Sequence, residues 1–288
     1  MANFVKDEAF ESYSVRFAEH FRMTRKDGVI EVAMHENGDS PRWSYELHRA
    51  LPQMFAAVGA DRENELLILT SLGNDWLTEF NQESFGIKQQ DFIPRSYDLW
   101  YYDGTKLQEN FLWCLDIPVI AVINGPGFHH EFALLADLTI CAPDVRFMEA
   151  HLPFGLVPGD ANYLVFQELL GTKRANQMAL MDRGIEADEA YDLGLVNEVL
   201  PREDLMPRAR EMAAVIMKNS RIVRRLTTQL LRRRWKRLFT DDFNMHFGFE
   251  LYASVVSETR HDNDTVEVLK AKYAAERAQK LEGASAEP

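Results

Sequence analysis

Several features that would assign a chain of 288 residues to a familiar class are scarce in this sequence. Only two cysteines occur, Cys114 and Cys141. They form neither a disulfide framework nor a spaced metal motif, so we interpret both as buried thiols. The longest wholly apolar run, Ile117–Ile123, is far shorter than the roughly 20 residues that cross a bilayer. The first residues lack a basic segment followed by an apolar one, so we expect no secretory signal and a cytoplasmic location.

Positive charge is also in short supply. Lysine and arginine number 32 against 45 aspartates and glutamates, which leaves a net charge of −13. Polyanions repel such a chain, so nucleic acid and membrane surfaces are not expected as partners. A basic cluster at 232–237 falls in a helical pattern. We interpret it as a solvated or subunit-facing helix side, and a membrane-surface or RNA-binding face is the alternative.

What the sequence does contain is a two-part pattern of secondary structure. Short apolar runs alternate with helical stretches at first, which indicates an α/β domain over residues 1–203. After Pro201 the apolar residues recur at helical spacing, as at Ala209, Met212 and Ala213. Residues 204–288 are therefore predicted to be a helical region whose tail frays from about Ala274. The expected strands are 29–34, 65–70, 119–123 and 138–142. The expected helices are 44–57 (capped by Ser44), 131–136, 162–170 and 187–193.

Aromatic residues gather in one stretch, residues 85–102, which we call the aromatic segment. Such density in a loop is compatible with a lid over an apolar substrate, with a local core patch or with a subunit contact, and the sequence leaves these three open. The residues concerned are Phe92, Tyr97, Trp100, Tyr101 and Tyr102.

The residues with the most chemical potential lie between Pro118 and Asp160. This stretch holds three histidines and three acids among apolar segments, and imidazole with carboxylate is what a general acid/base site needs. The histidines are His129, His130 and His151, and the acids are Glu131, Glu149 and Asp160. We expect Glu149 to face solvent.

The order and spacing of several motifs in this region are those of a known family. They read PVIAVING at 118–125, EFALLAD at 131–137, RFMEAHLPFGLVPGD at 146–160, LLGTKRANQMAL at 169–180 and EADEAYDLGLVNEVL at 186–200. On these residues the chain resembles the crotonase (enoyl-CoA hydratase/isomerase) superfamily. The resemblance implies a crotonase-type spiral of ββα turns followed by a C-terminal helical trimerisation region. A homotrimer or a hexamer made of two trimers is therefore expected.

The sequence departs from the hydratases of that superfamily at the site itself. The glycine-rich turn after Asn124–Gly125 is replaced by PGFHH, the loop after the ILT strand by SLGNDWLTEF, and the second glutamate by His151. These departures resemble one branch, the 6-oxocamphor hydrolase-like β-diketone hydrolases. The likeness implies His151 as a catalytic residue, with an aspartate nine residues later, Asp160, to orient it. It also implies catalytic roles for His129 or His130 and for Glu250, and a role for Trp43.

Each implied role has a chemical reason and an ordinary alternative. Hydrolysis of a 1,3-diketone needs a base for water, which suits His151, and a carboxylate such as Asp160 that holds its tautomer. It also needs donors to an oxyanion, for which we name Trp43 and a histidine N–H. Trp76 and Glu131 complete the oxyanion and substrate-binding candidates. The alternatives are a structural histidine at His151, a helix cap at Asp160, core packing at Trp43, helix-end charge at Glu131 and a solvated or interface position for Glu250.

Three functions therefore compete. The leading hypothesis is a cofactor-independent carbon–carbon hydrolase that cleaves a small, apolar, cyclic or bulky β-diketone to a keto acid by retro-Claisen chemistry. The second is an enoyl-CoA hydratase or dehydratase that uses Glu131 with His151. The third is a catalytically inactive homologue that serves as an assembly subunit. No metal is expected, because the histidines lack a supporting ligand pattern.

Overall fold

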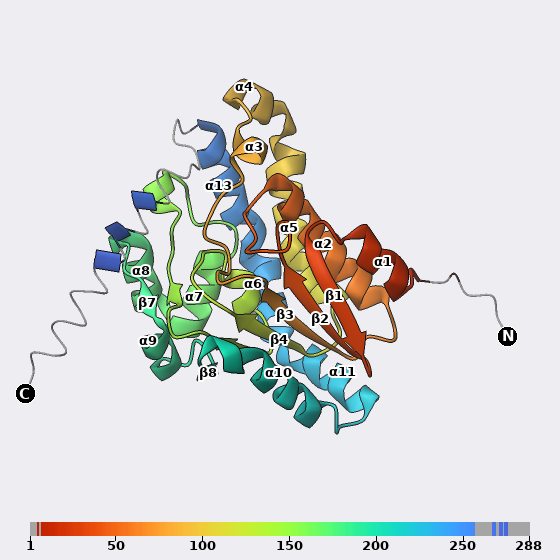
Figure 1. Ribbon diagram of the computed structural model, residues 1–288. Coiled ribbons are helices and arrows are strands. Elements are labelled where there is room, and N and C mark those ends of the chain that lie inside the picture. Colours follow the sequence, from red (N-terminus) through yellow and green to blue (C-terminus); the bar gives the residue numbers. More distant parts are fainter. Residues whose placement is uncertain (1–4, 6, 257–266, 269–270, 273, 276–288) are drawn as a thin grey trace, which may run out of the picture.

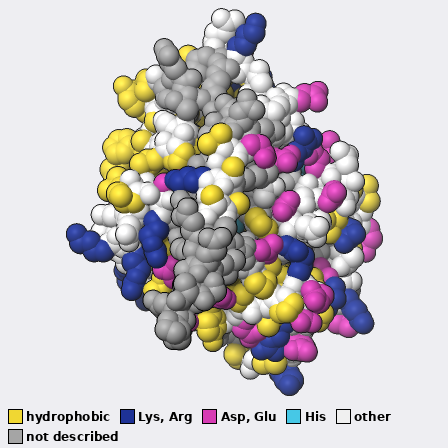
Figure 2. All heavy atoms as spheres, turned by 60° about the vertical axis from the view of Figure 1, so that its left-hand side comes forward, with side chains coloured by type: hydrophobic (Ala, Val, Ile, Leu, Met, Phe, Trp, Pro, Cys, Tyr) yellow, Lys and Arg dark blue, Asp and Glu magenta, His cyan; other side chains and the backbone are white. Residues whose placement is uncertain are grey.

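The computed structural model describes residues 5, 7–256, 267–268, 271–272 and 274–275 (Figure 1). The tail that is predicted to fray lies mostly beyond residue 275, and that part is outside the described residues. No helix in the described part of the chain combines the length and apolarity needed to cross a membrane. Basic and acidic side chains are interspersed on the face shown in Figure 2.

A six-stranded sheet forms the centre of the molecule, in the order β1-β2-β3-β4-β5-β8. All neighbouring strands run parallel except β1 and β2, which form an antiparallel pair. Every residue of β3 and β4 is buried, as expected for apolar runs covered on both faces. The bounds are β1 Phe21–Lys26, β2 Val29–Met34, β3 Leu66–Ser71, β4 Val119–Ile123, β5 Leu138–Cys141 and β8 Glu198–Val199.

The predicted elements of the first 200 residues are found with small shifts of their ends. Ser44 caps the helix after β2, because its hydroxyl accepts the Leu47 N–H at 3.0 Å, but this helix continues to Ala60. Pro52 lies inside it and is buried. A small second sheet pairs β6 with β7. The bounds are α1 Phe10–Arg16, α2 Tyr45–Ala60, α6 Glu131–Leu134, β6 Arg146–Phe147, α7 Asn162–Leu170, α8 Thr172–Met181, β7 Ile185–Glu186 and α9 Ala187–Asp192.

The aromatic segment is helical rather than a loop, which corrects the expectation from its composition. It lies within a chain of short helical pieces that stands beside α13 at the top of Figure 1. Two pieces, η2 and η3, are π-helical turns, a form that recurs at functional sites. The bounds are α3 Gln82–Phe85, α4 Gln89–Phe92, η1 Ile93–Arg95, η2 Tyr97–Tyr102, α5 Asp103–Glu109 and η3 Asn110–Cys114.

The region after Pro201 is helical in its described part, as predicted. Helix α11 exposes an apolar stripe that includes Val223, Leu226 and Leu230, the kind of face that a subunit contact would cover. Within the basic cluster, Arg232 is buried instead of solvated, because it binds Asp137 and two backbone carbonyls. The bounds are α10 Arg202–Ile216, α11 Arg221–Leu231, α12 Arg233–Leu238, the π-helical η5 Phe239–Phe243 and α13 Asn244–Val256.

The two cysteines differ in burial. Cys141 lies on β5 and is fully buried, as expected for a core thiol. Cys114 ends η3 and is only half-buried, so the expectation holds for one of the two.

Candidate active site

A small cavity of about 30 Å³ lies where elements from distant parts of the sequence meet; we call it the central cavity. Aromatic rings form one part of its wall, and histidines and acids form the other. Five of the eight candidate residues line it. The complete lining is Trp43, Tyr45, His48, Phe85, Trp100, His129, His151, Asp160, Phe247 and Glu250.

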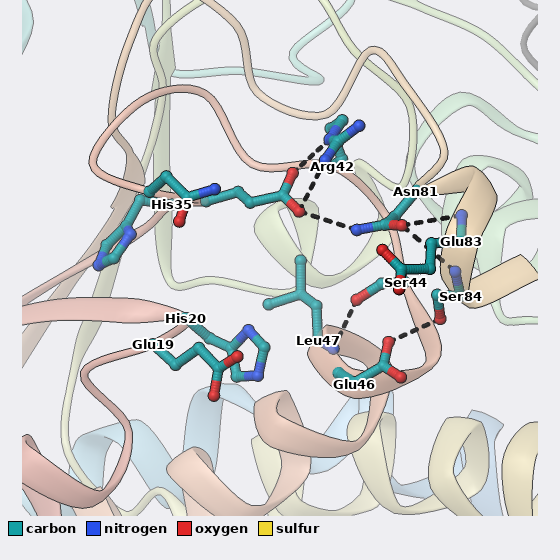
Figure 3. A pocket seen from close by; sticks show the side chains of 12 residues that line it. Glu19, His20, His35, Arg42, Ser44, Glu46, Leu47, Asn81, Glu83 and Ser84 are labelled. Atoms are coloured by element: carbon teal, nitrogen blue, oxygen red, sulfur yellow. Dashed lines mark hydrogen bonds and ion pairs between the residues drawn. The ribbon is translucent and has the colours of Figure 1, made fainter.

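A larger hollow of about 360 Å³ lies outside this cavity, between the start of α2 and the loop after β3. Figure 3 shows its polar lining, where the Glu36 carboxylate already binds Arg42 and Asn81. Glu46 likewise accepts the Ser84 hydroxyl at 2.6 Å. Because these charged groups satisfy one another, the larger hollow offers less for chemistry than the central cavity does.

His151 follows β6 and is held by an acid that the sequence analysis placed in solvent. Glu149 is only 1% exposed, and its Oε1 lies 2.7 Å from Nδ1 of His151. The same oxygen accepts the backbone N–H of His151 at 2.8 Å. A carboxylate on Nδ1 fixes the ring orientation and leaves Nε2 for chemistry. Glu149, rather than Asp160, therefore occupies the orienting position on Nδ1.

Asp160 lies on the opposite side of the His151 ring. Its Oδ2 is 3.3 Å from Nε2 of His151 and 3.2 Å from Nδ1 of His129, so one carboxylate oxygen bridges two imidazoles. Its Oδ1 accepts the backbone N–H of Asn162 at 3.1 Å, at the start of α7. The helix-end role and the position beside His151 therefore coexist.

The two adjacent histidines point to different places. His129 has a left-handed backbone (φ 55°) and lines the central cavity, where its ring stacks on Trp43 at 4.1 Å between centroids. Its Nδ1 lies 3.2 Å from Oε1 of the buried Glu131. His130 packs against Phe147 instead, and neither ring nitrogen has a partner among the described residues. Of the pair, His129 is the one at the cavity.

Trp43 and Trp76 have separate roles. Trp43 forms part of the cavity wall, and no hydrogen bond from its indole N–H is found in the described part of the chain. Trp76 is fully buried away from the cavity, and its N–H donates to the backbone carbonyl of His129 at 3.2 Å. Trp76 therefore supports the backbone of His129 and does not line the central cavity, and a role for it in substrate binding stays a prediction.

Glu250 reaches the cavity from α13 and is only 1% exposed, so the solvated alternative is wrong. Its Oε1 accepts the indole N–H of Trp100 at 3.0 Å and lies 3.8 Å from Nε2 of His151. Gly159 allows α13 to pack closely against the loop before α7, since a Cβ at position 159 would lie 2.2 Å from the backbone oxygen of His246 on α13.

His48 is a further cavity residue that the sequence analysis missed. It lies on α2, its Nδ1 is 3.2 Å from the carbonyl of Leu99, and its ring is 5.2 Å from that of Trp43. In the sequence it is one histidine in an amphipathic helix, where core packing is the ordinary interpretation. Only the fold brings it beside the other two imidazoles.

The electrostatics of the cavity favour two imidazolium ions. Burial opposes the charged form of His151, but Asp160, Glu149 and Glu250 outweigh it and raise the pKa of His151 well above its usual value. Burial likewise opposes a charge on His129, yet Glu131 and Asp160 raise its pKa to about 9. These shifts favour the protonated form of both rings, whereas the base expected at position 151 needs the neutral form.

Other groups of the cluster are held neutral by burial. Burial, helped by the nearby His129, lowers the pKa of His48 to about 4. Burial and His129 also lower the pKa of His130 to about 3. Burial raises the pKa of Glu250 to about 8 against the opposing charge of His151. At pH 7 most Glu250 side chains therefore carry a proton.

Two overlapping groups of side chains have the composition of a metal site. One joins His129, Glu131 and Asp160, and the other joins His151, Asp160 and Glu250. In each group the candidate ligand atoms lie within 4.8 Å of one another, and nitrogen with oxygen donors would suit a divalent transition metal. The expectation that the protein uses no metal stays a prediction.

The two loops that replace the hydratase motifs pair directly with each other. Phe128 N–H donates to Leu77 O at 2.8 Å, and Trp76 N–H donates to Pro126 O at 2.8 Å. Gly127 permits this contact, because a Cβ there would lie 2.5 Å from the nitrogen of Leu77. The N–H groups of Trp76 and Phe128 are thus already used and cannot stabilise a thioester oxyanion.

Comparison with known proteins shows to which family the chain is similar. The model of the enoyl-CoA hydratase/isomerase family matches residues 24–273. A solved β-diketone hydrolase from the cyanobacterium Anabaena sp. PCC 7120, bound to (S)-3-oxocyclohexyl acetic acid, is 31% identical with a TM-score of 0.79, covering 84% of this chain and 96% of that one. An enoyl-CoA hydratase/isomerase from Mycobacterium paratuberculosis has a TM-score of 0.76 at 19% identity, over 88% of this chain and 98% of that one, which shows the fold alone.

Curated sequence relatives bear a different name. Carnitinyl-CoA dehydratase of Escherichia coli strain K12 is 27% identical over 70% of this chain and 76% of its own length. Its counterpart from Salmonella agona strain SL483 is 33% identical over the same shares. With the family model spanning most of the chain, the protein belongs to the enoyl-CoA hydratase/isomerase (crotonase) family.

Proposed function

We propose that the protein is a carbon–carbon bond hydrolase that cleaves a cyclic or bulky apolar β-diketone to a keto acid by retro-Claisen chemistry, without a cofactor. The observation that carries the proposal is the position of His151 in an aromatic-walled cavity, with a carboxylate facing each ring nitrogen. The likeness to the Anabaena β-diketone hydrolase supports it.

The reaction uses His151 twice. Its Nε2 takes a proton from water while the water oxygen bonds to one carbonyl carbon and that carbonyl becomes an oxyanion. The His129 imidazolium and the free indole N–H of Trp43 stabilise the oxyanion. When the oxyanion collapses, the carbon–carbon bond breaks and its electron pair remains on the other fragment as an enolate. The enolate carbon then takes the proton from His151, so one water is added in total.

The raised pKa of His151 has a consequence for this cycle. Only the fraction of enzyme whose His151 has lost the Nε2 proton can accept a proton from water. Glu149 keeps the Nδ1 proton in place during the exchange, because its Oε1 lies 2.7 Å from that nitrogen. The base therefore becomes abundant only at a more alkaline pH than an ordinary histidine would require.

An acyl-CoA hydratase or dehydratase that uses Glu131 and His151 is the second candidate. The named activity of the carnitinyl-CoA dehydratases favours it. The backbone pairing between Leu77 and Gly127 disfavours it, because the N–H groups of Trp76 and Phe128 donate to backbone carbonyls there and are not available to a thioester oxygen. An inactive assembly subunit is the third candidate, and turnover of any β-diketone counts against it.

The deciding experiment incubates the protein with a panel of cyclic and bicyclic β-diketones. Mass spectrometry should detect a product heavier by one water. We expect His151→Ala to lower kcat by roughly 10²–10⁴-fold while circular dichroism shows an intact fold. His35 lines the larger hollow outside the central cavity, so His35→Ala is the matched control and should keep the wild-type rate.

Two results would contradict the proposal. One is wild-type turnover by His151→Ala, because the base would then be another group. The other is the absence of any diketone product together with saturable acyl-CoA binding in calorimetry, which would favour the hydratase.

A further inference from the structure

Trp100 is one of the cavity residues that the proposed reaction does not use. It lies on the π-helical turn η2, is 8% exposed and forms part of the wall of the central cavity. Its ring meets Tyr45 edge-on at 6.3 Å and Phe92 edge-on at 6.0 Å between centroids. These contacts fix the ring, and its N–H points at an acid 150 residues further along the chain.

That acid, Glu250, has two oxygens in unlike surroundings. Oε1 accepts the Trp100 N–H at 3.0 Å. Oε2 is buried and has no hydrogen-bond partner among the residues that the structure describes. An indole N–H donates only, so it can bond only to an oxygen with a free lone pair.

We propose that Trp100 is a positioning residue, whose indole N–H reserves Oε1 of Glu250 as a hydrogen-bond acceptor and leaves Oε2 to carry a proton towards a ligand in the central cavity. A protonated carboxyl has one oxygen that accepts and one O–H that donates. With Oε1 occupied by Trp100, the donating O–H is on Oε2. The carboxyl can then donate to a substrate oxygen without rotating.

The surroundings of Glu250 agree with this division. The charged and titratable groups that face it are His151 from the loop after β6, Asp160 from the loop before α7 and, farther away, His129 from the loop before α6. Burial keeps its proton on, with a pKa of about 8, while the Trp100 N–H favours the ionised form. Removing the N–H should therefore raise this pKa.

The first test needs no substrate. The Glu250 carboxyl is titrated by ¹³C NMR in the wild type, in Trp100→Phe and in Trp113→Phe. Phenylalanine keeps an aromatic ring but lacks the N–H. Trp113 lies on η3, outside the central cavity and 43% exposed, so its substitution is the matched control.

We expect the wild type and Trp113→Phe to titrate near pH 8 and Trp100→Phe to titrate about one pH unit higher, since a hydrogen bond to a charged group has roughly that worth. An unchanged Glu250 titration in Trp100→Phe would overturn the proposal. This outcome is independent of any reaction, so it is separate from the proposed function.

The second test concerns turnover and rests on the proposed function. We expect Trp100→Phe to lower kcat for a β-diketone by about tenfold, with a smaller change in KM, and to move the alkaline limb of the pH profile upward by about one unit. In a Glu250→Ala background, which has no group for Trp100 to orient, the same substitution should have little further effect on kcat, because Trp100 acts through Glu250.

Multiplying effects in the double variant would show that Trp100 acts independently of Glu250 and would overturn the proposal. If the wild type converts no diketone at all, the proposed function fails, and the NMR titration still decides the role of Trp100.

Discussion

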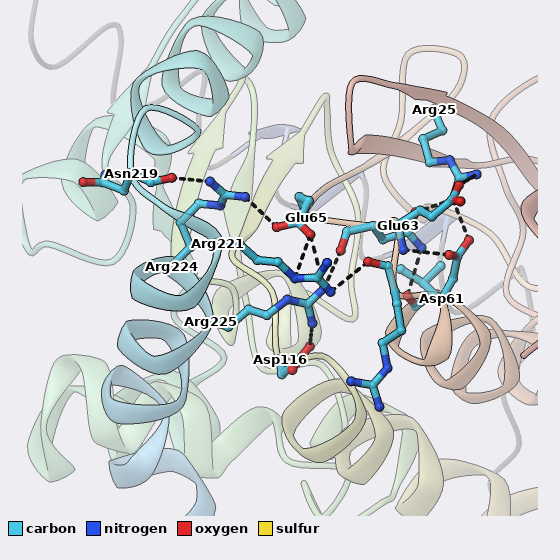
Figure 4. Close-up of polar contacts among 12 residues, drawn as sticks. Arg25, Asp61, Glu63, Glu65, Asp116, Asn219, Arg221, Arg224 and Arg225 are labelled. Atoms are coloured by element: carbon cyan, nitrogen blue, oxygen red, sulfur yellow. Dashed lines mark hydrogen bonds and ion pairs between the residues drawn. The ribbon is translucent and has the colours of Figure 1, made fainter. Parts of the chain in front are cut away.

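Two clusters of charged side chains in this molecule differ in how their charges are balanced. On α11, Arg224 and Arg225 bind Glu65, and Arg225 also binds Asp116, so guanidinium and carboxylate groups face each other directly (Figure 4). In and around the central cavity, the four acids Glu131, Glu149, Asp160 and Glu250 face only two imidazoles whose pKa is raised, those of His129 and His151. Oxygens of Glu131, Glu149 and Glu250 remain without hydrogen-bond partners in the described part of the chain.

The difference shows how one fold keeps a cluster that stabilises the structure apart from a cluster that can carry out catalysis. Arginine keeps its proton at any ordinary pH, so the α11 cluster has a fixed charge and can only fasten the C-terminal helices to the sheet. The cavity cluster must settle its charge with protons that are shared among histidines and carboxylates. Those protons can move within the physiological pH range, which is what catalysis requires.

The largest expected effect concerns Glu149. Glu149→Gln should lower kcat by about 10²–10⁴-fold, because an amide can hold the wrong tautomer of His151 and cannot stabilise its imidazolium. Kinetics with a β-diketone substrate measure the loss. Glu46→Gln, in the larger hollow, is the control and should keep the wild-type kcat. Near-normal kcat in Glu149→Gln would mean that the acid on Nδ1 is unimportant.

The α11 cluster should respond in stability. Arg225→Ala should lower the free energy of unfolding by about 1–3 kcal/mol, because Asp116 loses its guanidinium partner and the backbone carbonyl of Asn64 loses a buried donor. Arg221 contacts the same Glu65, at 3.2 Å, but its side chain is 51% exposed, so Arg221→Ala should cost less than about 1 kcal/mol. Urea unfolding of both variants compares them. Equal losses would show that burial does not set the effect.

Below about pH 8, stability and activity should change in opposite directions as the pH rises. The folded protein binds more protons than the unfolded chain between pH 6.5 and 9, because His129 has a pKa of about 9 and Glu250 one of about 8, both above their usual values. Stability therefore falls as pH rises through this range. kcat/KM should rise with pH while His151 loses its proton, and turn down when Glu250 ionises near pH 8.

Melting temperatures and kcat/KM measured in the same buffers test this relation. Glu250→Gln should reduce the fall of the melting temperature, because one of the two groups no longer titrates. A melting temperature that increases from pH 6.5 to 9 would contradict the raised pKa values of His129 and Glu250.

The smallest effect is expected at His130. His130→Leu should raise the free energy of unfolding by about 1 kcal/mol, because it removes a buried imidazole whose two nitrogens lack partners among the described residues. Thermal unfolding measures the gain. His129→Leu, one residue earlier, should instead abolish turnover. A loss of stability in His130→Leu would indicate that ordered water satisfies the ring.

Much of the fold was predictable because apolar runs are local signals. The continuous run 119–123 is the buried strand β4, and Ser44 caps α2 as its hydroxyl position indicates. The aromatic segment misled because π-helical turns have no clear apolar period. Its residues are divided between the cavity wall, as at Trp100, and exposed positions such as Tyr97.

The site was predictable only in part. The resemblance to the β-diketone hydrolases implied that Asp160 lies beside His151, but it did not reveal that Glu149 would hold Nδ1. Glu149 is in an alternating stretch where exposure is the ordinary interpretation. His48 and Trp100 come from segments far from the motif region, so only tertiary contacts could identify them.

The volume of the central cavity bears on the order of events. A space of about 30 Å³ accommodates one or two water molecules, whereas ligand pockets usually measure about 300–1,000 Å³. A ring-shaped ketone needs more space than this, so part of the aromatic wall has to move before it can enter. Substrate entry is thus a separate step from cleavage of the carbon–carbon bond. A kcat that falls as solvent viscosity rises would identify substrate entry as the rate-limiting step.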